Sequence, residues 1–125
     1  MIKFFSILFL SCLFLACSKN NSVDDKILPV IAINSPSNGQ TFAGGTTVNI
    51  TADITDNDKL VEIHVHIYNQ ATGQLLIDIH RYPNAASYSL NESFLTQNNI
   101  NYTIRIIAID KSANQQMQTI SVSTN

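Results

Sequence analysis

Hydrophobic and polar residues alternate along most of the chain, in short runs that end at Asn, Asp, Gly, Ser or Pro. Every second residue from Val48 to Thr55 is apolar, and the same period recurs from Val61 to Tyr68. A period of two puts alternate side chains on opposite faces of a strand, so each run predicts a strand with one buried face. Seven runs have this pattern: 27–33, 48–55, 61–68, 75–82, 87–94, 102–108 and 120–122.

Turn-forming residues separate these runs at intervals typical of antiparallel sheets. Residues 34–39 form one such cluster, and Phe42 is expected to enter the core just after it. The loop 70–73 is short enough to make a hairpin of the runs on either side. No run has the apolar spacing of an amphipathic helix. We therefore predict an all-β fold, a seven-stranded antiparallel β-sandwich.

The N-terminus has a different pattern, in which Lys3 precedes an apolar stretch of 13 residues from Phe4 to Ala16. Spanning a bilayer as a helix takes about 20 residues, so the stretch predicts a cleaved signal peptide, residues 1–16. Its end, Phe14-Leu15-Ala16-Cys17, resembles the bacterial lipobox, whose cysteine is acylated and becomes the new N-terminus. The resemblance implies a lipoprotein anchored to the bacterial outer membrane through Cys17, on its periplasmic or its surface side. The alternative is an ordinary secretory signal with an incidental cysteine.

Cleavage would leave 109 of the 125 residues, enough for one domain. Residues 17–26 are polar and predict a flexible tether, with the folded domain at 27–125. Cys12 lies in the signal peptide, so the domain has no cysteine for a disulfide or a metal site. Its six basic and nine acidic residues give a net charge of −3 without a basic run, which argues against nucleic acid as a partner.

Three segments of the chain carry a family resemblance: residues 34–39 with Phe42 and Gly44-Gly45; residues 50–53 leading into 56–58; and residues 102–114. They resemble segments of the bacterial Ig-like modules, which are similar to fibronectin type III and cadherin domains. The resemblance implies an immunoglobulin-like sandwich over residues 28–123. It specifies no function, because such modules serve as spacers, adhesive units and carbohydrate-binding accessories.

All three histidines of the chain fall on two runs that the hairpin should pair. Alternation puts His64 and His66 on the polar face of one strand, and Asp78 and His80 on the polar face of the next. Register parity keeps these four side chains together, because a slip of one residue would expose the apolar face. Opposed imidazoles can share a zinc ion, so these four residues are a candidate metal site. A solvent-facing strand pair is the alternative, with Glu62 and Tyr68 adding polarity to the same face.

A second candidate ion site is a turn that carries Asp53, Asp56 and Asp58, with Asp110 on a later turn. Loop carboxylates are ligands that Ca²⁺ prefers, although the spacing lacks the Gly and closing Glu of an EF-hand loop. An ordinary Asp- and Asn-rich turn explains the same residues.

Catalytic motifs are absent from the sequence: GxSxG, the P-loop, HExxH and the dinucleotide-binding glycines do not occur. We therefore expect a protein that is not an enzyme and has no required cofactor. The leading hypothesis is a lipid-anchored Ig-like module that recognises a protein or glycan of the cell envelope. The alternative is a zinc-binding envelope lipoprotein that uses the histidine-rich sheet face.

Overall fold

The structure is a computed structural model, and it describes residues 24–125. The expected signal peptide, Cys17 and most of the expected tether lie outside the described residues. Residues 24–125 contain no helix that is long and apolar enough to cross a membrane. The strands are β1 (Val30–Ser35), β2 (Gln40–Phe42), β3 (Thr47–Asn69), β4 (Leu75–Arg81), β5 (Ala85–Leu95), β6 (Tyr102–Asp110) and β7 (Gln115–Thr124).

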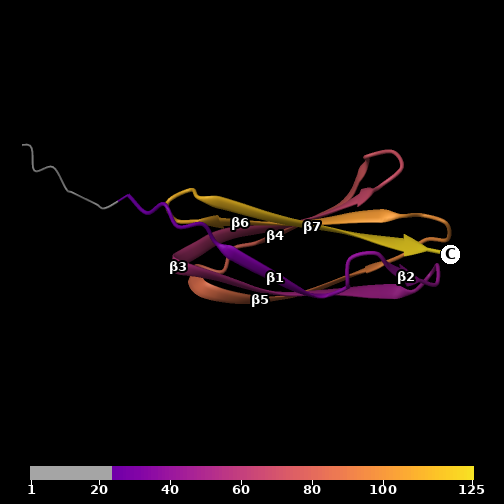
Figure 1. Cartoon of the computed structure of the whole chain (residues 1–125), viewed down its shortest axis with the longest axis horizontal. Coiled ribbons are helices and arrows are strands. Elements are labelled where there is room, and N and C mark those ends of the chain that lie inside the picture. The colour runs from indigo at the N-terminus through magenta and orange to yellow at the C-terminus, as the bar shows by residue number, and fades with distance from the viewer. Residues whose placement is uncertain (1–23) are drawn as a thin grey trace, which may run out of the picture.

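The strands pack as two layers that share the long strand β3 (Figure 1). Residues 47–55 of β3 pair with β1 and β5 to form the first layer. Residues 60–69 pair with β4 on one side and β6 on the other, and β6 continues to β7 and β2 in the second layer. The chain thus crosses between layers within β3, at residues 56–59. The all-β prediction is confirmed, as is the hairpin between the second half of β3 and β4.

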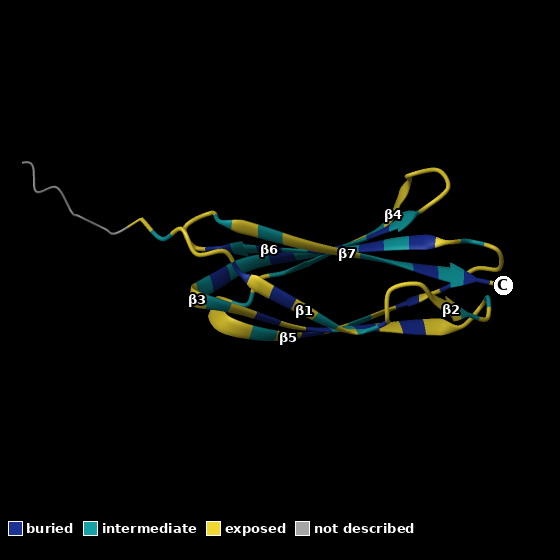
Figure 2. Cartoon of the chain, viewed as in Figure 1, coloured by how far each residue is buried: buried dark blue, intermediate teal, exposed yellow. Residues whose placement is uncertain are grey.

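The core lies between the layers, where the alternation read from the sequence becomes alternating burial (Figure 2). Strand β6 shows this most clearly, since every second residue from Tyr102 to Asp110 is buried. Phe42 is half-buried and packs against the core, as expected. Burial of these aliphatic side chains, each contributing about 1.5–3 kcal/mol, is the main source of stability in a domain without disulfides. Fully buried side chains include Val48, Ile50, Ile54, Leu60, Ile63, Val65, Ile67, Ile104 and Ile106.

Three details of the sequence prediction are corrected by the structure. The sheet is mixed, because β2 pairs with β7 in parallel. The runs 48–55 and 61–68 belong to one strand, β3, so the seven predicted runs correspond to six strands. The seventh strand is β2, which the alternation pattern did not predict. Val61 was expected in the core, but Leu60 is buried instead, because the register with β6 shifts between Leu60 and Glu62.

Tyr102 fastens the start of β6 to the loop before it. Its side chain is 2% exposed, and its ring packs edge-on against Phe94 at 5.1 Å between ring centroids. The Tyr102 hydroxyl oxygen accepts a hydrogen bond of 2.8 Å from the backbone N–H of Gln97. In immunoglobulin-like sandwiches, a tyrosine near the start of a strand close to the C-terminus commonly makes a hydrogen bond of this kind to backbone a few residues upstream. This corner therefore fixes the connection between β5 and β6.

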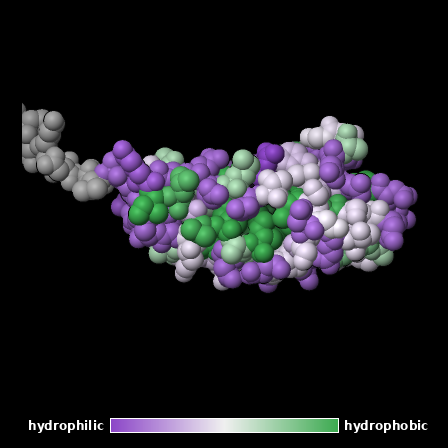
Figure 3. All heavy atoms as spheres, viewed as in Figure 1, coloured by the Kyte–Doolittle hydropathy of each residue, from purple (hydrophilic) through white to green (hydrophobic). Residues whose placement is uncertain are grey.

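Apolar side chains also reach the surface on the side of the domain that carries β1 (Figure 3). At the entry to that strand Ile27, Leu28 and Val30 are 60%, 48% and 61% exposed. The described chain begins at the same end as these residues, whereas the C-terminus lies at the opposite end (Figure 1).

Candidate ligand-binding face

The histidines lie on the outer face of the second layer, where β3 and β4 pair. His64 stands directly opposite His80, and His66 directly opposite Asp78. Alternate residues of β3 in this region, Ile63, Val65 and Ile67, are fully buried, so the polar set has to point outward. The structure thus brings all four residues of the candidate metal site together. With Glu62 they form what we call the histidine face: Glu62, His64, His66, Asp78 and His80.

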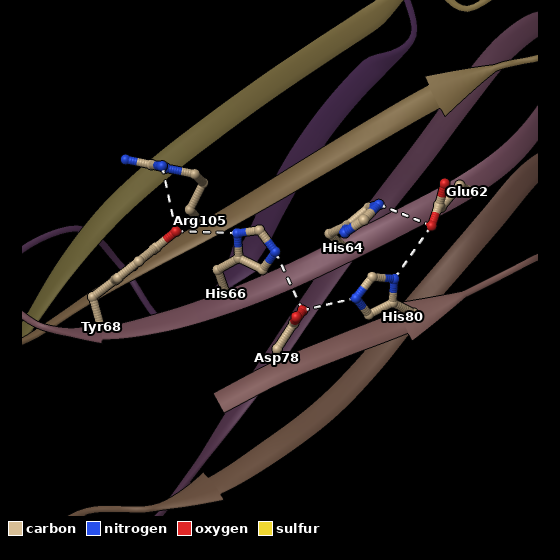
Figure 4. A network of polar contacts seen from close by, with 7 residues as sticks. All are labelled: Glu62, His64, His66, Tyr68, Asp78, His80 and Arg105. Atoms are coloured by element: carbon tan, nitrogen blue, oxygen red, sulfur yellow. Dashed lines mark hydrogen bonds and ion pairs between the residues drawn. The ribbon is translucent and has the colours of Figure 1, made fainter. Parts of the chain in front are cut away.

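Two carboxylates link the three imidazoles (Figure 4). The Oε1 atom of Glu62 lies 3.0 Å from His64 Nε2 and 3.2 Å from His80 Nδ1. The Oδ1 atom of Asp78 lies 3.2 Å from His66 Nε2 and 3.0 Å from His80 Nε2. The rings of His64 and His80 are 4.1 Å apart between centroids. His80 therefore bridges the two carboxylates with both of its ring nitrogens.

These contacts shift the ionisation of four groups. Hydrogen bonding to His80 lowers the pKa of Asp78 and that of Glu62. In return, hydrogen bonds to Asp78 and then to Glu62 raise the pKa of His80 above its ordinary 6.5. Burial lowers the pKa of His66, and the charge of Asp78 offsets this only in part. His80 therefore favours its charged form, and His66 its neutral form.

Tyr68 and Arg105 continue the network beyond His66 (Figure 4). The Tyr68 hydroxyl lies 3.2 Å from His66 Nδ1, and Arg105 reaches that hydroxyl at 3.5 Å. The neutral form of His66 satisfies both of its contacts, because Nδ1 then accepts from the Tyr68 O–H while Nε2–H donates to Asp78. The order of donation runs from Arg105 through Tyr68 and His66 to Asp78.

The face extends across β6 and β7 with more apolar chemistry. Ile107 lies opposite His64, and Met117, which is 48% exposed, lies opposite Ile107. Tyr82 follows β4, is 64% exposed and stacks on His80 at 6.5 Å between centroids. No pocket is present in residues 24–125. The outer face of the second layer is therefore an open surface that combines imidazole, carboxylate, guanidinium, aromatic and aliphatic groups.

Two groups of three residues on this face could each hold a metal ion. In each group the candidate ligand atoms lie within 4.8 Å of one another. The first group is Glu62, His64 and His80, and the second is His64, His66 and Asp78. Each offers two imidazoles and one carboxylate, a donor set that suits zinc.

The second candidate site, the aspartate-rich turn, is not assembled as expected. Asp53 accepts hydrogen bonds from Asn34 and Ser89 on the outside of the first layer. Asp58 lies 3.9 Å from the Lys111 ammonium group. Neither of these two carboxylates belongs to a group of three candidate ligands within residues 24–125.

Asp56 instead gathers with Asp25 and the buried Asp110, with ligand atoms within 4.8 Å of one another. The pKa of Asp25 is lowered by hydrogen bonds from the Ile27 N–H and the Asn57 side chain. Sequence reasoning included Asp110 but missed Asp25, which it assigned to the tether.

Arg105 is the member of the polar network that sequence reasoning missed. Its place between the inward-facing Ile104 and Ile106 indicated only that it points outward. Its position beside the histidines depends on the pairing of β6 with β3, in which Arg105 stands opposite His66. The strand order of Ig-like domains, taken from the family resemblance, could have predicted that β6 pairs with β3.

Solved structures share the fold at low sequence identity. Fibronectin(III)-like modules of Clostridium thermocellum CbhA match with a TM-score of 0.56 and 15% identity, over 79% of this chain and 47% of that chain. The PKD domain of an M14-like peptidase from Thermoplasmatales archaeon SCGC AB-540-F20 matches with a TM-score of 0.52 and 21% identity, over 78% and 92%. A superoxide reductase from Ignicoccus hospitalis matches with a TM-score of 0.58 and 8% identity, over 79% and 81%. These likenesses show the fold alone.

Sequence comparisons identify the family. A comparison with curated proteins gave no match. The family model of the bacterial Ig domain matches residues 29–122, which is most of the chain and includes all seven strands apart from the last two residues of β7. The chain therefore belongs to the bacterial Ig domain family.

Proposed function

We propose that the protein is a lipid-anchored, non-catalytic module of the bacterial cell envelope that recognises a protein or glycan through the outer face of its second layer. The observation that carries the proposal is the ordered network on that face, from Glu62 through the histidines to Arg105. Side chains already held by one another lose little rotamer freedom on binding, which favours recognition by an open sheet face. Met117 and Tyr82 add exposed apolar and aromatic area beside the network.

The anchor in this proposal is Cys17, at the outer membrane. Several acyl chains on one cysteine give stable attachment, since each buried methylene contributes about 0.8 kcal/mol. Growth of the bacterium with labelled palmitate tests this part. We expect the wild-type chain to be labelled and Cys17→Ser to be unlabelled. Cys17→Ser should also be released from the membrane fraction. Unlabelled wild-type protein would refute the anchor without bearing on the binding face.

The binding face is tested by retention on envelope material. Purified full chain is passed over isolated cell-wall glycan and, separately, over detergent-solubilised envelope proteins. Tyr68→Ala and Arg105→Ala should weaken retention on one of the two, because they remove the aromatic and cationic part of the network. Ser89→Ala and Asn91→Ala, on the outer face of the first layer, serve as controls. Equal retention of all four variants and the wild type would count against the face.

Zinc binding is a second candidate function. It is favoured by the close approach of four side chains on the histidine face: His64, His66, His80 and Asp78. Imidazole and carboxylate groups on neighbouring strands are suitable zinc ligands, and three of them can converge within 4.8 Å. Calorimetric titration of the full chain with zinc chloride tests this function. Heat of binding that disappears in His64→Ala supports it, and the absence of binding heat in the wild type refutes it.

A further inference from the structure

We infer that one zinc ion binds between β3 and β4, with His64, His66, His80 and Asp78 as ligands and with Glu62 and Tyr68 as the residues that orient the imidazoles. This inference rests on the second candidate function, zinc binding. It goes further because it separates the residues that bind the ion from those that only orient the imidazoles. It also names the nitrogen that each histidine offers to the ion.

Glu62 contacts one ring nitrogen of each of two histidines. Its Oε1 atom lies next to His64 Nε2 and His80 Nδ1, at 3.0 and 3.2 Å. Metal-binding histidines generally donate their second ring N–H to a carboxylate, which fixes the tautomer and the orientation of the ring. With these nitrogens bound to Glu62, His64 Nδ1 and His80 Nε2 remain for an ion.

Tyr68 has the corresponding role for His66. Its hydroxyl lies 3.2 Å from His66 Nδ1, and Nε2 is directed at Asp78. When zinc replaces the proton on Nε2, Nδ1 becomes the N–H group and donates to the Tyr68 oxygen, so the contact is kept with its direction reversed. Arg105 holds Tyr68 in turn, through the hydroxyl at 3.5 Å and through its position over the ring at 5.1 Å from the centroid. His66 Nε2 and His80 Nε2 thus both point at one Asp78 oxygen, and each nitrogen has to release its proton for zinc to bind.

Two of the separations between the proposed ligand atoms are close to those of a tetrahedral zinc site. Ligand atoms about 2.0–2.1 Å from zinc are roughly 3.4 Å from one another in a tetrahedron. His66 Nε2 and His80 Nε2 lie 3.2 and 3.0 Å from Asp78 Oδ1, close to that separation. Because His66 and His80 belong to different groups of three, their nitrogens have to close on the ion as it binds. Three nitrogens and one oxygen complete four-coordination without Glu62 as a ligand.

The experiment compares variants that separate the two ligand sets. Full chain in detergent is stripped with chelator, titrated with zinc by calorimetry, and loaded with cobalt for its visible absorption spectrum. The variants are His66→Ala, Asp78→Asn, Glu62→Gln and Tyr68→Phe. Asp58→Asn, which removes an exposed carboxylate on the bend of β3, is the matched control. Far-UV circular dichroism verifies that each variant is folded.

The wild type and Asp58→Asn should bind one zinc per chain and show the strong absorption of tetrahedral cobalt. Glu62→Gln and Tyr68→Phe should weaken zinc by about 10- to 100-fold while keeping that absorption, as loss of an orienting partner does. His66→Ala and Asp78→Asn should weaken zinc by more than about 100-fold, beyond the range for orienting partners, and change the cobalt spectrum.

Two results would overturn the inference, and they are distinguishable. Wild-type zinc affinity in His66→Ala and Asp78→Asn, with binding lost in Glu62→Gln, would place the ion at Glu62, His64 and His80. Zinc binding would then stand as a function, and the ligand assignment would fall. No binding by the wild type would remove both.

Discussion

Replacing Tyr102 by Phe removes one hydroxyl from the corner that fastens β6 and leaves the ring in place. The hydroxyl accepts the Gln97 N–H at 2.8 Å in a partly buried setting. A hydrogen bond contributes about 1 kcal/mol net, and an orphaned buried donor costs about 1–3 kcal/mol. We expect a loss of roughly 1–2 kcal/mol, because Gln97 is itself exposed and water can reach part of its backbone.

Thermal and urea unfolding of the full chain measure this loss. Circular dichroism is the suitable signal because the chain has no tryptophan. Each kcal/mol moves the midpoint by about 4–8 °C in a domain of 60–100 residues, so Tm should fall by roughly 4–16 °C. Tyr88→Phe is the control, since this half-buried tyrosine packs on the core and its hydroxyl makes no hydrogen bond within residues 24–125. Equal effects of the two substitutions would refute the role of the corner.

Four other substitutions test the packing and the electrostatics, each followed by urea unfolding. Gly44→Ala should lower the free energy of unfolding by about 1–3 kcal/mol through overpacking, because the added Cβ would lie 2.6 Å from the Asn98 Cα. Gly45→Ala should lower it less, because a Cβ there meets open space and only the positive φ of +76° is unfavourable. A larger loss for Gly45→Ala than for Gly44→Ala would contradict this reasoning. Ile106→Ala should cost about 2–5 kcal/mol, because the side chain is fully buried, and a loss under 1 kcal/mol would mean that the core collapses around the gap. His80→Gln should destabilise the metal-free chain more below pH 6.5 than above the raised pKa of His80. The reason is that a pKa raised by folding adds stability below the pKa of the unfolded chain, and this stability is lost as the pH rises through the pKa of the folded chain. A loss of stability that does not change with pH would contradict this prediction.

The period-two pattern was sufficient to predict which side chains share a face, and this accounts for both the core and the histidine face. His64 and His66 could be assigned to the outside because Ile63, Val65 and Ile67 have to be inside. The short loop then brought Asp78 and His80 to the same face, since a hairpin fixes the register of its two strands.

Features that depend on distant parts of the chain could not be read in the same way. Strand β2 has three residues, too few to show a period, and it is defined by pairing with β7 at the other end of the sequence. The burial of Leu60 in place of Val61 follows from a register shift against β6. Arg105 and Asp25 reach their clusters through contacts between segments far apart in sequence.

The central claim, that the outer face of the second layer is the binding surface, is tested most directly by photo-crosslinking in living cells. A photoreactive amino acid replaces Met117 on that face or, as the control, Asn91 on the outer face of the first layer. We expect light to join the Met117 position to an envelope protein or glycan, giving a discrete adduct that Tyr68→Ala diminishes and that the Asn91 position does not give. Adducts at Asn91 alone, or equal adducts at both positions, would contradict the claim.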